Sequence, residues 1–332
     1  MPQNLPIRLL VSIALLFGYH LLMVFSLAPH LLVKEIFLWI LGLAFFYLGR
    51  HLNPSQFTSF NRLLFAFICL LLLLPLVFNL PTRGSRRWLN LGLFSFQPSE
   101  ITRPLSALFL ANTSHPLYQL IPVFLIALQP DLGSAFLSLV LLVPLILYQA
   151  RLIKISLLIL LITSLLTPFA WKNLLHDYQR QRIITFLHPN LDPIGQGYHV
   201  IQSKIAIGSG GFLGKGFKKG SQSQLLFLPE KHTDFIFAAT VEELGFISVI
   251  IILLAYYLLL SSLLIQAFSH QTNQALFRFS LMVAFLIWTQ VVINIGMNLG
   301  LLPITGITLP FLSIGGTSLV SLLFSLGIAF SS

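Results

Sequence analysis

Charged residues are scarce in this sequence, and their scarcity restricts the class of protein it can be. Asp, Glu, Lys and Arg together make up 8% of the 332 residues, whereas 56% are hydrophobic. A soluble domain carries about 25% charged residues, which keep its surface in water. A soluble globular fold is therefore excluded, and most of the chain is expected to face lipid or other apolar helices.

Several sequence signals of other classes are also missing. The one cysteine, Cys69, lies in an apolar run, so it can form no internal disulfide and argues against a metal cluster. The spacing of His and Cys matches no zinc site. The glycine-rich run 208–216 misses the P-loop spacing by one residue, has no Ser or Thr after Lys215 and follows no predicted strand. This run is predicted to be a flexible loop.

What the sequence does contain is a series of long apolar segments. About 20 helical residues at a rise of 1.5 Å cross a hydrocarbon core of ~30 Å. The runs are continuous and rich in Leu, Ile and Phe, without the period-two alternation of a β-barrel. The sequence therefore predicts an all-α, polytopic integral membrane protein, with one domain over 1–332 and about ten transmembrane helices. The segments lie at 7–28, 32–49, 60–80, 98–113, 117–129, 133–149, 152–171, 235–265, 276–298 and 309–330.

The fifth segment, 117–129, is too short to span a bilayer comfortably. A break at Gln129, Pro130 and Asp131 separates it from the sixth, so it is either a half-length helix or part of one long kinked element. With ten segments, the loops 80–97, 172–234 and 299–308 share one side of the membrane. Positive residues do not settle the orientation, because placing the termini in the cytoplasm puts seven inside and twelve outside.

The stretch 172–234 is the large polar part of the chain. It is too charged to span a membrane and too rich in Ile, Leu and Phe to be a disordered linker. Tyr198, Ile201 and Ile205 fall on one helical face, which favours an amphipathic helix in the membrane interface, although Val200 interrupts the stripe. The net charge of +10 favours an anionic lipid or lipid-linked substrate over nucleic acid.

One group of polar residues precedes and opens the fourth segment. Arg86, Arg87 and Trp88, followed by Gln97, suit the binding of a phosphate and a sugar ring, but Arg and Trp are also ordinary anchors at a membrane interface. Glu100 and Arg103 stand three residues apart on a predicted helix and are expected to pair. Unpaired, each would cost roughly 2.5–3.5 kcal/mol at the bilayer centre.

A second group immediately precedes the segment 235–265. Asp234 and Thr233 could each cap the helix that follows, and Glu230, Lys231 and His232 add titratable groups there. Glu242 and Glu243 lie about 12 Å further along and must face protein or water. The Asn, Pro and Gly residues of 294–316 predict either a broken helix that lines a cavity or an irregular outer loop.

Taken together, these motifs resemble the SEDS family (shape, elongation, division and sporulation). The matching strings are "RRWLNLG" with "FQPSE", "QPDLGSA", "HDYQRQRI", "LPEKHTDFIFA" with "EELG", and "NIGMNLGLLPITGITLPF". "YQRQRI" and "SQSQL" are closer to its RodA-type, elongation branch than to its division branch. The first three segments match in hydropathy and position alone.

The resemblance implies a fold and an activity. We expect ten spans with both termini in the cytoplasm, and the large extracytoplasmic loop at about 172–234. The expected enzyme is a peptidoglycan glycosyltransferase of the bacterial cytoplasmic membrane, which polymerises lipid II at the outer face during elongation and maintains cell shape. Its expected partners are a class B penicillin-binding protein and other membrane proteins of the elongation complex.

The resemblance also assigns residues. The essential aspartate of the family falls on Asp234, which is expected to be the general base. Its tryptophan falls on Trp88, its Glu–Lys pair on Glu100 and Arg103, and its cavity aspartate on Asp131. Two positions depart from the family pattern: Arg103 stands where Lys is usual, and Ile314 replaces a common aromatic.

Further substrate contacts are expected from basic and polar residues around this base. Candidates for the leaving pyrophosphate are Arg86, Arg87, Lys204 and the cluster Lys215–Lys219, while Gln97 and His232 complete the predicted substrate site. A divalent cation could share this work, but the sequence shows no site for one. Two other functions would fit buried charges and broken helices: a lipid II flippase, and a non-catalytic scaffold for a penicillin-binding protein.

Overall fold

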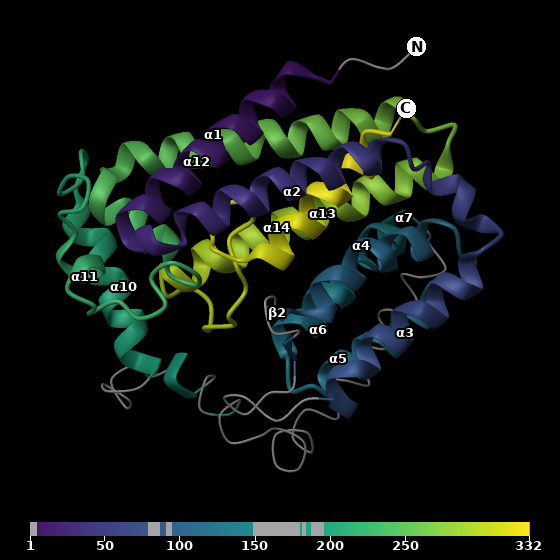
Figure 1. The fold of residues 1–332 in the computed structure, drawn as a ribbon, viewed down its shortest axis with the longest axis horizontal. Helices are drawn as coiled ribbons and strands as arrows, with labels where there is room; N and C mark the ends of the chain where they lie inside the picture. Colours follow the sequence, from purple (N-terminus) through teal and green to yellow (C-terminus); the bar gives the residue numbers. More distant parts are fainter. Residues whose placement is uncertain are drawn as a thin grey trace.

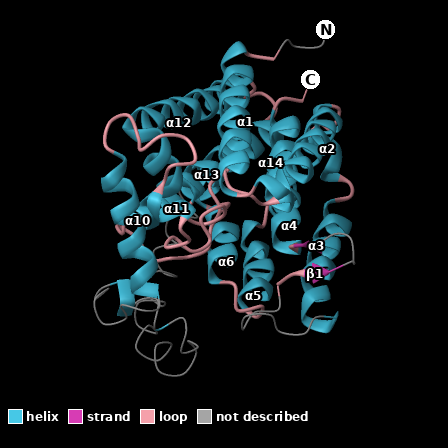
Figure 2. Cartoon of the chain, turned by 60° about the vertical axis from the view of Figure 1, so that its left-hand side comes forward, coloured by secondary structure: helices cyan, strands magenta, loops and turns pink. Residues whose placement is uncertain are grey.

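A computed structural model describes residues 5–78, 87–90, 95–148, 180, 184–186 and 196–331. These residues are mostly helical, as Figure 2 shows, and their strands form one short antiparallel hairpin of β1 (Leu89–Asn90) and β2 (Ser95–Phe96). Among the described residues, five helices are long and apolar enough to cross a membrane. The predicted all-α, polytopic membrane fold is confirmed.

The helices occupy nine of the ten predicted segments, and the other one, 152–171, lies outside the described residues. They are α1 (Ile7–Leu27), α2 (Leu32–Arg50), α3 (Asn61–Phe78), α4 (Pro98–Ala111), α5 (Leu120–Ala127), α6 (Leu132–Val140), α7 (Val143–Tyr148), α10 (Gln196–Gly210), α11 (Ser221–Gln224), α12 (Ile236–Ser269), α13 (Gln274–Asn298) and α14 (Gly316–Ala329). Three short 3-10 helices join some of them: η1 (Pro29–Leu31), η2 (Pro54–Thr58) and η3 (Pro116–Gln119).

Helix α13 lies in the middle of the bundle (Figure 1). It packs against α12 and α14 on one side and against α4, α6 and α7 on the other. Helices α1 and α2 complete the first group, and α3 and α5 complete the second. The start of α1 and the end of α14 lie at the same end of the bundle, whereas α10 and α11 lie at the opposite end. Residues far apart in sequence therefore meet around α13.

Helices α5 and α6 form an antiparallel hairpin. The amide of Gln119, just before α5, donates to the hydroxyl of Ser138 near the end of α6, at 2.8 Å. The start of one helix therefore lies beside the end of the other. Of the two alternatives for the fifth segment, the half-length helix is correct and the long kinked element is wrong. Asp131 caps α6 by accepting from the backbone N–H of Ser134 at 3.1 Å, which fixes the start of the second helix.

Helix α12 is broken at Gly245. Its 34 residues would extend about 51 Å as one straight helix, far more than a ~30 Å hydrocarbon core requires. Gly245 has φ 76° and ψ −175°, a conformation outside the helical region. A short part, 236–244, therefore lies next to the polar end of the molecule, and a longer part, 246–269, runs through the bundle.

The segment that follows α10 fills this break. The N–H groups of Lys215 and Gly216 donate to the carbonyl oxygens of Glu242 and Glu243, at 2.9 and 3.0 Å. A side chain on Gly245 would collide with the backbone nitrogen of Gly214. The loop predicted at 208–216 is confirmed for 211–216, whereas 208–210 belong to α10. This loop is tied down by hydrogen bonds, because peptide groups opened by the break need partners and the loop supplies them.

Helix α10 packs against α12 with the face that includes Val200, Ser203 and Ala206, which are buried. The stripe predicted to face the membrane interface, Tyr198, Ile201 and Ile205, does not belong to that buried face, and Ile205 is 44% exposed. The amphipathic pattern of α10 is therefore present, and whether the stripe contacts lipid stays a prediction.

The last predicted segment becomes helical later than expected. Helix α14 begins at Gly316, and residues 309–315 form a turn instead. The hydroxyl of Ser313 accepts from the N–H of Leu309 at 2.8 Å, and the buried Phe311 has a positive φ of 62°. The Ser313 bond and the positive φ of Phe311 give residues 309–315 the shape of a turn, so the helix starts only after them.

Candidate active site

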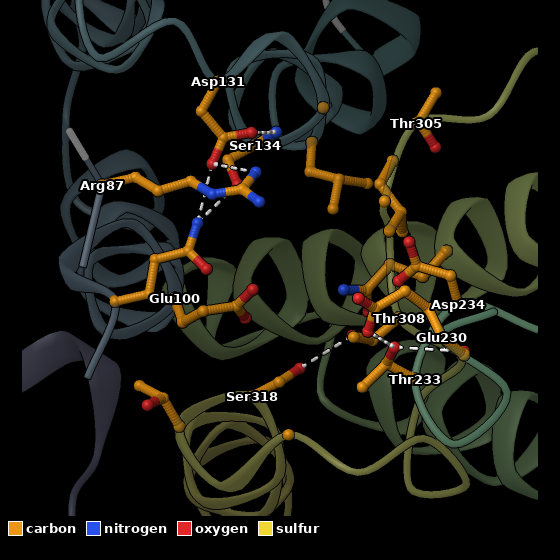
Figure 3. Close-up of a pocket in the computed structure, with 18 of the residues that line it drawn as sticks. Arg87, Glu100, Asp131, Ser134, Glu230, Thr233, Asp234, Thr305, Thr308 and Ser318 are labelled. Carbon is orange, nitrogen blue, oxygen red and sulfur yellow. Dashed lines mark hydrogen bonds and ion pairs between the residues drawn. The ribbon is translucent and has the colours of Figure 1, made fainter. Parts of the chain in front are cut away.

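A polar cavity of about 450 Å³ opens between α4, α6, α13 and α14 and the loop before α12 (Figure 3). It draws residues from separate parts of the sequence. The polar, charged and aromatic side chains that line it include Arg87, Trp88, Gln97, Glu100, Arg103, Asp131, Ser134, His199, Glu230, Thr233, Asp234, Gln290, Thr305, Thr308, Thr317 and Ser318. A cavity of this polarity inside a membrane bundle marks a site for a polar or charged ligand.

One wall of the cavity is built around Asp131. Its Oδ2 accepts from the amide of Gln97 at 2.7 Å and lies 3.7 Å from Nη1 of Arg87. Figure 3 shows the Arg87 side chain pointing toward Asp131. Its Oδ1 accepts from the N–H of Ser134. The carboxylate is 4% exposed and the Arg87 side chain 35% exposed. Asp131 therefore fixes the direction of a guanidinium that reaches the cavity.

The predicted pair of Glu100 and Arg103 is confirmed. Nη1 of Arg103 lies 2.6 Å from Oε2 of Glu100, and Nη2 donates to the hydroxyl of Ser134 at 3.1 Å. Both residues are buried on α4. The planar guanidinium of Arg103 contacts Glu100 through one nitrogen and Ser134 through another. Arg103 thereby joins α4 to α6 at this wall.

Asp234 lies on the opposite wall, next to Glu230 and Thr233 (Figure 3). The N-cap position of α12 is Phe235, which supplies no side-chain cap. Asn298 of α13 supplies one from another helix, because its Oδ1 accepts from the N–H of Ala238 at 3.1 Å. That is the bond an N-cap side chain makes. Asp234 precedes the N-cap position, and its half-buried side chain lines the cavity.

The backbone of Asp234 is held by α13. Its carbonyl oxygen accepts from the amides of Asn294 and Asn298, at 3.1 and 3.0 Å. Asn294 also donates to the carbonyl oxygen of Ile307, at 2.8 Å. These bonds join the loop before α12 to the irregular segment after α13. The two sides of the cavity that contain Asp234 and Thr308 are thereby fixed to one helix.

Two other residues of the loop before α12 point elsewhere. The ammonium of Lys231 is buried and donates to the carbonyl oxygen of Ser223. Burial lowers the pKa of Lys231, while the carboxylate of Glu243 opposes this shift. Burial also lowers the pKa of His232, against the raising effect of Glu230. Neither Lys231 nor His232 lines the cavity.

The remaining predicted site residues are dispersed. Lys204 is exposed on α10, where its side chain lies against Gly300, and it does not line the cavity. Arg86 lies outside the described residues. The structure thus gathers Arg87, Trp88, Gln97, Glu100, Arg103, Asp131 and Asp234 in one cavity, and it brings neither Lys204 nor His232 to them.

Lys215, from the predicted pyrophosphate cluster Lys215–Lys219, has a different partner. Its ammonium lies 2.9 Å from Oε1 of Glu242, which also accepts from the N–H of Gln222 at 2.8 Å. Glu243 accepts from the hydroxyl of Ser26 at 2.6 Å. The two glutamates face protein, as predicted, and are fully buried. The ion pair with Glu242 holds Lys215 next to α11. None of Lys215, Lys218 and Lys219 lines the cavity.

The sequence did not single out several cavity residues, of which Gln290 is the most informative. It is fully buried on α13, and within the described part of the chain neither atom of its amide has a hydrogen-bond partner. A buried amide in that state is expected to bind a ligand or water. A signal was present, since Gln290, Asn294 and Asn298 recur every four residues along one face of an apolar helix.

No metal centre is visible in the part of the chain that the structure describes. No group of three or more His, Cys, Asp or Glu side chains there is placed to hold an ion.

A family model supplies the identity of this arrangement. Residues 5–331 match the cell cycle protein family of FtsW, RodA and SpoVE. The chain belongs to this family. The match covers nearly the whole chain and includes every residue of the cavity, so the site is part of the conserved family domain rather than an addition to it.

Relatives and solved structures agree with this assignment. The peptidoglycan glycosyltransferase MrdB of Escherichia coli K12 is 38% identical, over 98% of this chain and 92% of MrdB. A probable peptidoglycan glycosyltransferase FtsW of Coxiella burnetii is 33% identical, over 90% of this chain and 85% of its own. A chain from a structure of a peptidoglycan synthase complex superposes with a TM-score of 0.82 at 33% identity, covering 98% of this chain and 97% of that one. The rod shape determining protein RodA of Thermus thermophilus gives a TM-score of 0.70 at 27% identity, covering 97% and 94%.

Proposed function

We propose that this chain is a peptidoglycan glycosyltransferase that polymerises lipid II into glycan strands. The reaction takes place at the outer face of the bacterial cytoplasmic membrane during cell elongation. The names of the relatives support the reaction class. The polar cavity within a membrane bundle supports a substrate that has a charged head and a lipid tail.

The reaction joins two sugars. The 4-hydroxyl of the acceptor attacks the anomeric carbon of the donor, a C–O bond forms, and the bond from that carbon to the pyrophosphate breaks. Undecaprenyl pyrophosphate departs with the electron pair, and the proton of the hydroxyl passes to a base. The site must therefore supply a base, cationic stabilisation for the leaving group and a dry, ordered surface.

Asp234 is the proposed base. It lines the cavity from the loop before α12, and the bonds from Asn294 and Asn298 fix its backbone. Asn298 also makes the capping bond to Ala238, so α12 does not need the carboxylate of Asp234 as an N-cap. The position of the Asp234 side chain in the wall of the polar cavity is the observation on which the proposal rests.

The opposite wall is proposed to hold the pyrophosphate and the sugars. Arg87 reaches the cavity with its guanidinium directed by Asp131, a geometry suited to phosphate oxygens. Arg103 is bound to Glu100 and Ser134 and is proposed to shape the wall. Trp88 offers an aromatic face to a sugar ring, and Gln290 offers both a donor and an acceptor at the buried end of the cavity.

The proposed partner is a class B penicillin-binding protein, which would cross-link the strands made here. A related chain belongs to a complex whose description joins polymerisation with crosslinking. Other membrane proteins of the elongation complex are proposed to bind alongside it. A divalent cation could assist the departure of the pyrophosphate.

The test uses purified full-length chain in detergent with labelled lipid II, with and without the partner. We expect glycan chains whose length grows with time. A flippase would yield no polymer under these conditions. A non-catalytic scaffold would yield polymer only from the polymerase activity of another protein, and substitution of Asp234 would then leave the yield unchanged.

A further inference from the structure

Two titratable side chains are buried inside the membrane bundle at a distance from the cavity. His20 on α1 and Glu35 on α2 are each 1% exposed, and Nε2 of His20 lies 3.3 Å from Oε2 of Glu35. Neither residue lines the cavity. Ionisable groups inside a membrane domain are costly and are kept where they do specific work. The proposed reaction gives this pair no direct role, so its position calls for another explanation.

The contacts of His20 fix where its protons lie. Its Nδ1 lies 2.9 Å from the carbonyl oxygen of Leu312, which can only accept, so Nδ1 must carry a hydrogen and donate it. Nε2 faces the carboxyl group of Glu35. The carboxyl group of Glu35 lies against the other ring nitrogen at 3.3 Å, so the ring is held between Glu35 and Leu312 in the orientation that directs Nδ1–H at Leu312.

The residue that His20 binds belongs to the turn 309–315. Phe311, the residue before Leu312, is buried with a positive φ of 62°, a conformation that persists in a bulky residue only where its surroundings enforce it. The rings of Phe311 and His20 both lie near the buried Trp39, with centroids 6.3 and 5.8 Å from it. The turn is thus enforced by a ring contact on one residue and by the His20 hydrogen bond on the next.

The turn 309–315 also holds the backbone immediately before Asp234. The hydroxyl of Ser313 donates to the carbonyl oxygen of Thr233 at 2.6 Å. The N–H of Ile314 donates to the carbonyl oxygen of His232 at 3.0 Å. Ile314 and Thr233 line the cavity themselves. One hydrogen bond therefore joins His20 to Leu312, and the next two residues of the same turn make hydrogen bonds to the two residues that precede the proposed base.

We infer that His20, oriented by Glu35, is a positioning residue for Asp234. It acts by fixing the turn 309–315 against the loop 232–234, and it touches no substrate. This inference rests on the proposed function, in which Asp234 takes the proton of the acceptor hydroxyl. A displacement of about 1 Å at a reacting group can reduce a rate by roughly 100-fold, which is the scale of the expected effect.

Two amide substitutions separate the two contacts of the ring. In His20→Asn the side-chain nitrogen stands as far from Cα, counted in bonds, as Nδ1, so it can still donate to Leu312 but loses Glu35. In His20→Gln the nitrogen matches Nε2, so the contact with Glu35 can remain while the bond to Leu312 is lost. We expect His20→Gln to reduce kcat about 10- to 100-fold with little change in KM for lipid II, and His20→Asn to keep most of the wild-type kcat.

The same variants are compared by hydrogen–deuterium exchange, which needs no activity. Peptides covering 309–315 and 232–236 should exchange faster in His20→Gln than in His20→Asn, with α13 unchanged. Ser12→Ala, at another buried polar residue of α1, serves as the control and should alter neither measurement. If the wild-type chain makes no polymer, the proposed function fails. The hydrogen–deuterium exchange of peptides 309–315 and 232–236 would still show whether His20 holds the turn. Equal kinetics and equal exchange in the two His20 variants would overturn the inference, as would a loss in His20→Asn alone.

Discussion

The side-chain amide of Asn298 donates to the backbone carbonyl oxygen of Asp234 at 3.0 Å. Asn298 also caps α12 through Ala238, so removing the charge of Asp234 should leave the helix start intact. We expect Asp234→Asn to reduce polymerisation by at least about 100-fold, the usual contribution of a general base. Labelled lipid II with the purified variant measures this, and detergent-extracted protein level and partner binding should stay near wild type.

Glu230→Gln is the matched control for that substitution, because Glu230 is a second carboxylate on the same wall of the cavity. It should retain most of the polymerase activity. Equal losses in the two variants would show that the wall needs negative charge in general, and loss of folding in Asp234→Asn would restore a structural role for the aspartate.

Arg87→Ala should raise the lipid II concentration needed for half-maximal rate. A hydrogen bond to a charged group contributes about 1.5–3 kcal/mol, which corresponds to roughly a 10- to 100-fold increase in KM. Steady-state kinetics at several lipid II concentrations give the value. Arg8→Ala, at an exposed position at the start of α1, is the control. Unchanged kinetics in Arg87→Ala would leave that arginine as an anchor at the membrane interface.

Gln290→Leu should weaken activity without weakening the fold. No atom of this amide has a partner among the described residues, so an apolar side chain of similar size loses no protein hydrogen bond and should match or exceed the wild-type Tm. We expect KM for lipid II to rise about tenfold, consistent with one lost hydrogen bond to the substrate. Wild-type kinetics in a well-folded Gln290→Leu protein would mean that water, rather than substrate, occupies that position.

Gly245→Ala should destabilise the protein by roughly 3 kcal/mol or more, because a positive φ and a backbone collision with Gly214 act together. Thermal unfolding in detergent measures the drop in Tm. Gly208→Ala is the control. It lies in the same interlocked region, within α10, where an added Cβ meets nothing within 4 Å, so its Tm should stay the same or rise slightly.

Acidification should destabilise the wild-type chain more than His232→Gln. Burial lowers the pKa of His232 in the folded protein below its ordinary value of about 6.5. Between these two values the unfolded chain binds more protons at this site, so stability rises with pH there and falls as pH drops through the same interval. Tm measured from pH 7.5 to 5 should show a shallower slope in the variant, and parallel slopes would argue against a contribution from His232.

The sequence predicted the fold class and much of the site because those features depend on local signals. Apolar runs placed the helices, and the short spacing of Glu100 and Arg103 predicted their pair. The errors arose where a distant segment supplies the missing contact. Asn298 caps α12 from another helix, a contact that the local pattern at Thr233 and Asp234 could not indicate.

The other unpredicted contacts have a similar origin. The hydrogen bonds of the run 208–216 could not be predicted because its partners, the peptide groups around Gly245, lie beyond it in sequence and become available only when α12 breaks. Lys215 looked like a phosphate ligand until the fold placed Glu242 beside it. The contacts of a glycine or a lysine cannot be predicted from sequence when the residue lies in no periodic pattern and has no partner nearby in the chain.

The break in α12 also has a consequence for how the chain is assembled in the bilayer. The part 246–269 can insert as an ordinary span, because its internal peptide groups satisfy one another. The part 236–244 bonds to other segments: Glu242 and Glu243 accept from Lys215 and Gly216 after α10, and Ala238 donates to Asn298. The two parts of α12 therefore differ in what they need in order to form, one being a self-sufficient span and the other depending on residues that surround it in the fold.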